Sequence, residues 1–571
     1  MALKRSLHPS CRIQVKKKPM KVQPKNHLNI HSNYVYIQHP DFKEDPQLVG
    51  DSLFEDIQNL PEKSIIGPVL FSKDKKIYFF GGDFLPFSHL PMPWADNQDF
   101  INQYPEVREV GFIPLFSVLM PRDLYQKLPP PDYFDDNIVK HAEYIMKAKE
   151  LGYKCYVSPN VHLIYPNAYN PKQGRKKFIK EVSESLKEFS KKWGPTLDRR
   201  FRLPVVLHTI VSYAGGYNLH AYNVAKSLFE AGIRYYYHFI GGTNEDEGSS
   251  GCPFIDDTKT VYGSNKLPQI TIVHGVNNFK NSGLYKIAFT TTEVDGIPKD
   301  WVQCLNEMDE VWVTSQFAYD SFKRSGIKVP MYVIGEGVDP NYFHPKIAPF
   351  YNAPKEKFRF ISNFAWGRRK GVDVLFEAFR KEFSKDEDVC LMLKVTPSYW
   401  GHKIKDELKL LYDREGSAPV YIYDIELPKW ELGRFYTMGS VFLWPSRGEG
   451  FGLPALEAIA CGIPVLASNH SAHLEFLTRA GKPRPGVELI DGKLELYDKG
   501  DSIYYPGFHW FTPSVDDMRK KMRKMYNEYE KYKEGAMKTS EIIRKEYDWS
   551  VSTKRIVERL EDIYKKKFHR F

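Results

Sequence analysis

The feature of this sequence that most constrains its fold is an alternation of predicted strands and helices that occurs in two series. The first series begins with an apolar strand at 204–210 and a helix over 218–231. The second begins with a strand at 358–363 and a helix over 371–383, and it includes a further helix near 403–413. Alternation of this kind produces parallel sheets flanked by helices, with ligands beyond the carboxyl ends of the strands. Two series therefore predict two Rossmann-like domains with a ligand site in the cleft between them.

Residues 440–467 have the pattern of a strand, a glycine-rich loop, a helix and a second strand. Pro454 suits the first position of the helix, which we expect to end at Gly462. A helix N-terminus that follows glycines presents free backbone N–H groups and the positive end of the helix dipole. This segment therefore predicts a phosphate site.

Two glutamates, Glu449 and Glu457, belong to the same unit. Glu449 lies in the loop, and Glu457 lies about one and a half turns into the helix. Each carboxylate can accept hydrogen bonds from the hydroxyls of a sugar or a ribose, so the unit predicts a sugar-nucleotide site. The alternative is that the glycines are ordinary turn residues and that Glu457 is a solvated helix residue.

The unit closely resembles the donor-site motif of the family-4 retaining glycosyltransferases, which have the α/β GT-B fold with twin Rossmann-like domains. The resemblance rests on Glu449-Gly-Phe-Gly-Leu-Pro-Ala-Leu-Glu457 and on the Cys-Gly-Ile-Pro-Val run that follows. It extends over about residues 203–560 and includes Gly335-Glu-Gly-Val-Asp339. The organisation that it implies is an N-terminal acceptor domain over 201–350, a C-terminal nucleotide-sugar domain over 351–530, and helices over 531–571 that cross back.

Two adjacent basic residues, Arg369 and Lys370, follow the strand 358–363 and open the next helix. Two positive charges at such a junction can bind a diphosphate. The resemblance implies that these residues clamp the diphosphate of the donor. In many relatives the two are several residues apart, so Arg368 is an alternative to Arg369. A basic helix cap on the surface is the other interpretation.

Residues of the N-terminal domain also fit the resemblance. Gly215 and Gly216 match a glycine loop that lets donor phosphates approach the backbone, with a plain turn as the alternative. His274 ends an apolar strand and matches a histidine that binds a donor-sugar hydroxyl in some relatives, with a structural histidine as the alternative. Glu293 and Asp295 are weaker candidates for contacts in the cleft.

These assignments predict one catalytic and one donor-binding group of residues. The residues that we expect to orient the sugar or stabilise the leaving group are Glu449, Lys370, Arg369 and His274. The residues that we expect to bind the donor are Gly215, Gly216, Glu457, Gly450, Phe451, Gly452 and Leu453.

The expected reaction is transfer of a hexose-type sugar, with retention, from a UDP- or GDP-sugar to a glycan or another hydroxyl acceptor. The resemblance implies that no metal and no cofactor takes part. The alternative function is a non-catalytic scaffold that binds sugar nucleotides and derives from a transferase.

Residues 29–171 resemble the later half of the family-2 inverting glycosyltransferases, which have the GT-A fold. The first nucleotide-binding strands are missing, and the metal-binding Asp-x-Asp is reduced to Asp41 at best. Where that family has an acidic catalytic stretch, this chain reads Lys140-His-Ala-Glu143-Tyr. We therefore expect a truncated, non-catalytic module for packing, homo-oligomer formation or acceptor binding, or one that a partner chain completes. Residues 172–200 predict a connecting helix with a break at Gly194-Pro195.

The formal net charge of +10 is unevenly distributed, because residues 1–40 contain no Asp or Glu. We interpret residues 1–28 as a basic, disordered tail; an electrostatic anchor to anionic lipid or nucleic acid is the alternative. No apolar run reaches the roughly 20 residues that span a bilayer, and the six cysteines are scattered. We expect a cytoplasmic protein, with peripheral membrane contact through the tail as a second option and no nucleic-acid partner.

Overall fold

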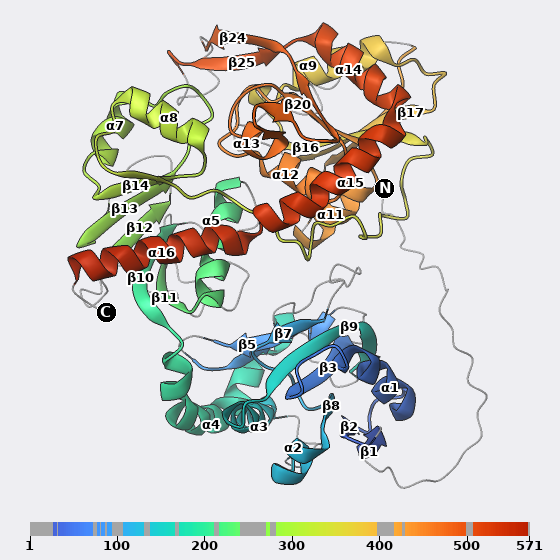
Figure 1. Cartoon of the computed structure of the whole chain (residues 1–571), viewed down its shortest axis with the longest axis vertical. Coiled ribbons are helices and arrows are strands. Elements are labelled where there is room, and N and C mark those ends of the chain that lie inside the picture. Colours follow the sequence, from blue (N-terminus) through green and yellow to red (C-terminus); the bar gives the residue numbers. More distant parts are fainter. Residues whose placement is uncertain are drawn as a thin grey trace.

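The structure of the 571-residue chain is a computed structural model. It describes residues 27–30, 32–71, 77–79, 81–85, 88–93, 107–130, 137–165, 171–209, 216–239, 270–274, 281, 283–396, 416–424, 427, 429–497 and 506–568. Most of the basic tail and the helix expected near 403–413 lie outside these residues. The described part contains three large β-sheets with their helices (Figure 1).

The C-terminal region is built on a six-stranded sheet in the order β18-β17-β16-β19-β20-β23. All neighbouring strands are parallel. Counted along the chain, this is the order 3-2-1-4-5-6 of a doubly wound sheet, in which ligands bind where the order reverses. The strands are β16 (Phe358–Ala365), β17 (Val389–Thr396), β18 (Val420–Asp424), β19 (Val441–Trp444), β20 (Val465–Ser468) and β23 (Val487–Ile490).

Helices of this region complete the strand–helix units and cover the sheet. They are α9 (Val372–Glu382), α11 (Lys429–Thr437), α12 (Leu453–Ala460), α13 (Leu474–Leu477), α14 (Val515–Asn527) and α15 (Tyr529–Glu546). A short 3₁₀ turn, η1 (Arg368–Lys370), precedes α9. Two small hairpins pair β21 (Thr478–Arg479) with β22 (Lys482–Pro483) and β24 (Gly492–Leu496) with β25 (His509–Pro513).

The second six-stranded sheet has the order β11-β10-β12-β13-β14-β15, again with parallel neighbours. Its strands are β10 (Arg202–Thr209), β11 (Ile233–Phe239), β12 (Ile270–His274), β13 (Tyr285–Thr290), β14 (Glu310–Val313) and β15 (Met331–Val333). Its helices are α5 (Gly216–Glu230), α7 (Lys299–Leu305) and α8 (Gln316–Ser325). The two parallel sheets are the arrangement that the strand–helix alternation predicts.

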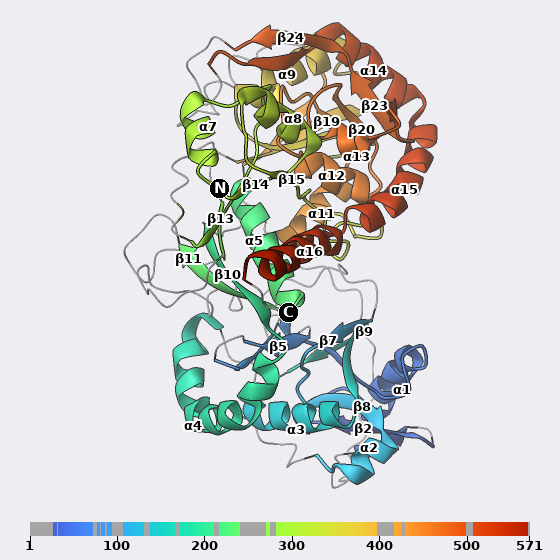
Figure 2. The same ribbon diagram turned by 60° about the vertical axis from the view of Figure 1, so that its left-hand side comes forward.

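The last helix, α16 (Trp549–Lys567), packs against α5 and β10 of this second sheet, so the end of the described chain returns to the N-terminal Rossmann-like region (Figures 1 and 2). Arg559 on α16 donates to the fully buried carboxylate of Glu310 on β14. The hydroxyl of Tyr564 donates to the carbonyl oxygen of Pro204. The helix therefore supplies both apolar packing and a counter-ion to a sheet that precedes it by more than two hundred residues.

The N-terminal module contains a mixed sheet in the order β1-β2-β8-β3-β9-β7, with β4 on β3. Its strands are β1 (His27–Ile30), β2 (Tyr34–Gln38), β3 (Ser64–Phe71), β4 (Ile77–Phe79), β7 (Arg108–Val110), β8 (Ser117–Pro121) and β9 (Lys154–Ile164). The hairpin of β5 (Gly82–Phe84) with β6 (Pro91–Pro93) lies beside it. The helices are α1 (Pro46–Ile57), α2 (Arg122–Lys127), α3 (Ile138–Glu150) and α4 (Pro171–Asp198).

The expected break at Gly194-Pro195 is wrong, because α4 continues through Pro195. A proline inside a helix removes one hydrogen bond. Here Phe189, Trp193 and Leu197 follow each other at intervals of four residues, so they share one face of the helix, and all three are buried. Burial of this face outweighs the lost bond, and α4 packs on α3 as a layer of the module.

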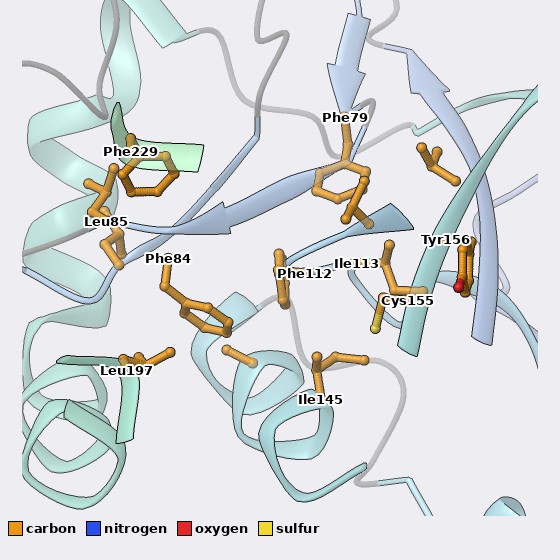
Figure 3. Close-up of a cluster of buried hydrophobic side chains, with 14 of the residues drawn as sticks. Phe79, Phe84, Leu85, Phe112, Ile113, Ile145, Cys155, Tyr156, Leu197 and Phe229 are labelled. Atoms are coloured by element: carbon orange, nitrogen blue, oxygen red, sulfur yellow. The ribbon is translucent and has the colours of Figure 1, made fainter. Parts of the chain in front are cut away.

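The apolar core of the N-terminal module continues into the neighbouring parallel sheet without interruption. Figure 3 shows this junction, where Phe229 of α5 lies near Leu85, and where Phe84 and Leu197 belong to the same cluster. The Arg200 guanidinium lies 5.1 Å from the ring of Phe229 and donates to Asp83 at 2.7 Å. The module is therefore packed onto the region that follows it.

Candidate functional site

The loop between β19 and α12 meets η1 at the carboxyl ends of the central strands of the C-terminal sheet. Gly452 ends the loop with a φ of +98°, and α12 begins at Leu453, with Pro454 in its first turn. Gly371 ends η1 with a φ of +70°, where a Cβ atom would lie 1.9 Å from the carbonyl oxygen of Pro445. The glycine at this position lets the basic turn lie directly against the loop.

Glu449 lies at the centre of this contact and is 5% exposed. Its Oε1 accepts from Lys370 Nζ at 2.6 Å and from Ser446 Oγ at 2.5 Å, and it lies 3.2 Å from Arg369 Nη1. Burial alone would raise the pKa of this carboxyl group, but Lys370 and Arg369 lower it to about 2. Glu449 is therefore ionised and held in one orientation.

The side chain of Lys370 is only 12% exposed, and its ammonium lies 4.7 Å from the centre of the Trp444 ring. Burial and the neighbouring Arg369 lower its pKa to about 8, although Glu449 opposes this shift. Arg369 donates to the carbonyl oxygen of Gly448 at 2.7 Å. Neither basic residue is a solvated helix cap, and Arg369 rather than Arg368 faces Glu449.

Glu457 lies on α12 and is 4% exposed, so the interpretation of a solvated helix residue is wrong. Its Oε2 accepts from the hydroxyl of Tyr436 at 2.7 Å, and Asn363 donates to the same hydroxyl at 3.0 Å. Burial and the nearby Glu457 raise the pKa of Tyr436 well above its ordinary value, so the hydroxyl keeps its proton. The result is a carboxylate that is fixed by the carboxyl-terminal ends of α11 and β16.

The second parallel sheet contributes to the same site from the other side. Thr291 and Thr314, just beyond β13 and β14, both donate to the carbonyl oxygen of Gly450, at 3.2 and 2.8 Å. Glu293 lies 3.6 Å from Arg369, and its carbonyl oxygen would be 1.9 Å from a Cβ atom at Gly448. The carboxyl ends of both sheets therefore meet at the glycine-rich loop. The sequence predicts a ligand site at this position, between the two Rossmann-like domains.

Glu336 is a residue of this site that sequence reasoning did not single out. It lies in the crossover between the two sheets, and its Oε1 is 3.9 Å from His220 Nδ1 on α5. Burial, with the negative charges of Glu449 and Glu457, raises its pKa to about 8, whereas burial lowers the pKa of His220 to about 3. The local sequence at 335–337 carries no signal for this environment, because the neighbours of Glu336 are His220, Glu449 and Glu457, which are distant in the chain.

The structure describes the other predicted site residues only in part. Gly216 is the first residue of α5, whereas Gly215 lies outside the described part of the chain. His274 is the last residue of β12, with its side chain outside the described part. Phe451 and Leu453 have buried side chains, and the ring of Phe451 packs against that of Phe476.

In the N-terminal module, Asp41 and Glu143, the acidic residues that the resemblance to family 2 singles out, do not form a cluster like the one around Glu449. Asp41 Oδ2 lies 3.8 Å from His39 Nδ1. Glu143 pairs instead with Lys147 and Lys192. Among the residues that the structure describes, no group of three or more His, Cys, Asp or Glu side chains is arranged to hold a metal ion. No described helix is long and apolar enough to cross a membrane.

Comparison with known families assigns the C-terminal part. Residues 351–556 match the family model described as "Family 4 Glycosyltransferase in conflict systems". This part of the chain is therefore similar to family-4 glycosyltransferases. The match contains Arg369, Lys370, Glu449 and Glu457, so the paired charges described above lie within the matched residues.

Individual proteins are similar to parts of the chain. A D-inositol 3-phosphate glycosyltransferase of Arthrobacter sp. (strain FB24) is 34% identical over 192 residues, which are 30% of this chain and 45% of the relative. A probable sucrose-phosphate synthase of Thermosipho melanesiensis is 26% identical over 156 residues, which are 26% of this chain and 35% of the relative. The chain thus spans less than half the length of these relatives. The crystal structure of Anabaena HepE with UDP and glucose aligns with 63% of this chain and 99% of its own, at 14% identity and a TM-score of 0.45.

Proposed function

We propose that this protein is a retaining glycosyltransferase that transfers a hexose-type sugar from a UDP- or GDP-sugar to a hydroxyl acceptor. The observation that carries the proposal is the buried Glu449–Lys370 pair at 2.6 Å, which lies beside the glycine-rich loop and the N-terminus of α12. Removing two charges from water is costly, and a buried ion pair often adds little to stability. Stability alone therefore does not account for an ion pair at this position. Sugar-nucleotide binding explains why both charges are retained next to free backbone N–H groups.

In the proposed reaction the acceptor hydroxyl attacks the anomeric carbon on the face from which the nucleoside diphosphate leaves. The C–O bond to the diphosphate breaks, a new C–O bond to the acceptor forms, and the diphosphate takes up the proton of the acceptor. Lys370, Arg369 and the backbone N–H groups of residues 450–453 stabilise the charge that develops on the diphosphate. These groups supply the positive charge that a divalent metal provides in other transferases, so the proposed reaction is independent of metal.

Two carboxylates hold the donor in this scheme. Glu449, fixed by Lys370 and Ser446, accepts from hydroxyls of the sugar. Glu457, fixed by Tyr436, accepts from the ribose diol. His274, Gly215 and Gly216 are the donor contacts that the family resemblance implies for the N-terminal Rossmann-like region. The acceptor is a glycan or another hydroxyl compound, and the names of the relatives add inositol phosphate and sugar phosphates to the candidates.

The test is to incubate the protein with a panel of UDP- and GDP-sugars and to follow release of the nucleoside diphosphate. Wild type and Glu457→Ala are compared, with and without chelator. Slow release from one donor that Glu457→Ala abolishes and chelator leaves unchanged is the expected result. If no donor is hydrolysed and none raises the melting temperature, the enzyme assignment is wrong. Donor-induced stabilisation without release or transfer would instead favour the non-catalytic scaffold.

A further inference from the structure

The hairpin of β24 and β25 connects the two Rossmann-like regions at a point outside the strand–loop–helix unit. Trp510 on β25 and Tyr497, directly after β24, are 4% and 1% exposed, and their rings meet edge to face at 4.7 Å. Both pack in one buried cluster with Val294, which comes from the loop after β13 in the other region. An apolar side chain of one region is therefore inserted among aromatic residues of the other.

Polar and steric contacts secure the same insertion. Asp295 accepts from the backbone N–H of His509 at 2.8 Å and lies 2.9 Å from its Nδ1. A Cβ atom at Gly296 would lie 2.5 Å from the ring of Phe508. Residues 294–296 are thus held at three consecutive positions by the hairpin.

The other contacts of Trp510 lead to the basic turn. The guanidinium carbons of Arg368 and Arg447 lie 5.0 and 5.2 Å from the centre of its ring. Arg447 is 3% exposed and makes two hydrogen bonds to Asp373, at 2.7 and 2.8 Å, and one to the carbonyl oxygen of Arg368 at 2.6 Å. The ring therefore packs on one residue of η1 and on the arginine that fixes η1 to the start of α9.

Backbone hydrogen bonds continue this connection. The N–H of Arg447 donates to the carbonyl oxygen of Arg369 at 2.7 Å, and the N–H of Phe511 donates to the carbonyl oxygen of Arg447 at 2.9 Å. The strand that carries Trp510 is thus two hydrogen bonds away from the residue that contacts Glu449. Arg369 and Lys370 are the diphosphate-binding residues of the proposed function.

We propose that Trp510 is a positioning residue that couples docking of the loop 294–296 to the geometry of the diphosphate-binding turn 368–370. This inference rests on the proposed function for the ligand and on the contacts above for the coupling. Withdrawal of Val294 from the cluster exposes Trp510 and loosens Arg368 and Arg447, so the turn is ordered best when the two regions are docked. Because coupling is reciprocal, diphosphate binding in turn favours the docked state.

The first test needs no ligand. Hydrogen exchange is measured at the amides of Lys370, Gly371 and Arg447, which donate to Gly367, Arg368 and Arg369. Trp510→Leu and Val294→Asp are expected to exchange about tenfold faster at these amides, since loss of a desolvated cation–π contact is of that size. Trp510→Phe, which keeps an aromatic face, is expected to restore most of the protection.

Phe383→Leu is the matched control, because Phe383 is a buried aromatic residue at the C-terminal end of α9, with the Arg523 guanidinium 4.3 Å from its ring. It tests whether any truncated aromatic residue has the same effect. The proposal is overturned if the amides of Lys370, Gly371 and Arg447 exchange no faster in Trp510→Leu than in Phe383→Leu.

The second test measures affinity for UDP and GDP against affinity for uridine and guanosine, which lack phosphates. Trp510→Leu is expected to weaken nucleoside diphosphate binding about five- to tenfold, because the turn that holds the diphosphate is less ordered. Nucleoside binding is expected to stay unchanged. An equal loss for nucleosides and nucleoside diphosphates overturns the positioning role. Failure of the wild type to bind any nucleoside diphosphate refutes the proposed function instead, and the exchange result then decides the coupling alone.

Discussion

The glycine-rich loop of the C-terminal domain and the α3 surface of the N-terminal module both carry lysine–glutamate pairs, but in different surroundings. Lys370 and Glu449 are 12% and 7% exposed at their side chains, whereas Lys192 and Glu143 are 53% and 40% exposed. Solvated pairs contribute little to stability or to the local potential, while a buried pair acts in a medium where charges interact strongly. Charge burial, rather than charge content, therefore separates the proposed donor site from the N-terminal module.

Substitution of Glu449 should have the largest effect. Glu449→Gln keeps the shape of the side chain, removes the charge that Lys370 and Arg369 face, and should lower the turnover of the identified donor about 100- to 1,000-fold. The measurement is release of nucleoside diphosphate at saturating donor. Glu488→Gln is the matched control, because Glu488 accepts from Lys524 at the same 2.6 Å distance in the same region, away from the loop. Equal losses in the two variants would assign the pair a structural role.

A smaller loss is expected at the second carboxylate. Tyr436→Phe removes the hydroxyl that donates to Glu457 at 2.7 Å and should weaken binding of the nucleoside diphosphate about tenfold. Titration calorimetry with UDP and GDP measures this change. Tyr532→Phe, which removes a hydroxyl hydrogen-bonded to Glu488, is the control and should leave the affinity unchanged. Unaltered affinity in Tyr436→Phe would show that the orientation of Glu457 does not matter for the ligand.

Glu336 gives a prediction about pH. Its pKa is raised from 4.5 to about 8. Between pH 4.5 and pH 8, Glu336 is therefore protonated in the folded protein and ionised in the unfolded chain. The free energy of unfolding of the wild type should therefore fall as the pH rises through this window. Glu336→Gln removes this pH-dependent loss of stability. The melting temperature of the variant minus that of the wild type should therefore increase from pH 5 to pH 8.5. The exposed Glu541→Gln is the control, and a difference that is constant with pH would contradict the shift.

The smallest effect is expected in the N-terminal module. Asp41→Asn should change donor turnover by less than about twofold, because a solvated side chain away from a site contributes little. The same assay, run with and without chelator, checks the prediction. A large loss of donor turnover in this variant, together with a turnover that requires a divalent metal, would show that the N-terminal module is itself an active site.

Much of the C-terminal domain could be predicted from the sequence because its determinants are local. Apolar strands, glycines and a proline within residues 440–467 define the strand–loop–helix unit, and the positions of Glu449 and Glu457 follow from it. The resemblance placed Lys370 at the same site as a diphosphate-binding residue, but the ion pair of Lys370 with Glu449 was not predicted, because it joins side chains at the ends of two neighbouring strands. The sequence pattern also indicated a break at Pro195, but burial of the α4 face overrides the local preference.

Glu336 and Trp510 could not be predicted because their environments are made by residues far away in the chain. Glu336 lies 3.9 Å from His220, which is on the first helix of the other sheet, and its pKa is raised by burial and by two further glutamates. Trp510 is buried by Val294, while its cationic neighbours come from η1 and from the loop after β19. No periodicity reports such contacts. They require the tertiary arrangement of both sheets.

The return of α16 to the first parallel sheet has a consequence for the order of synthesis. Glu310 emerges from the ribosome long before Arg559, yet its carboxylate is fully buried and paired with that arginine in the finished protein. A buried carboxylate without its counter-ion is strongly unfavourable. The sheet formed by residues 202–333 therefore cannot reach its final packing during translation of its own residues. It must wait, in a looser state, until α16 with Arg559 has been made.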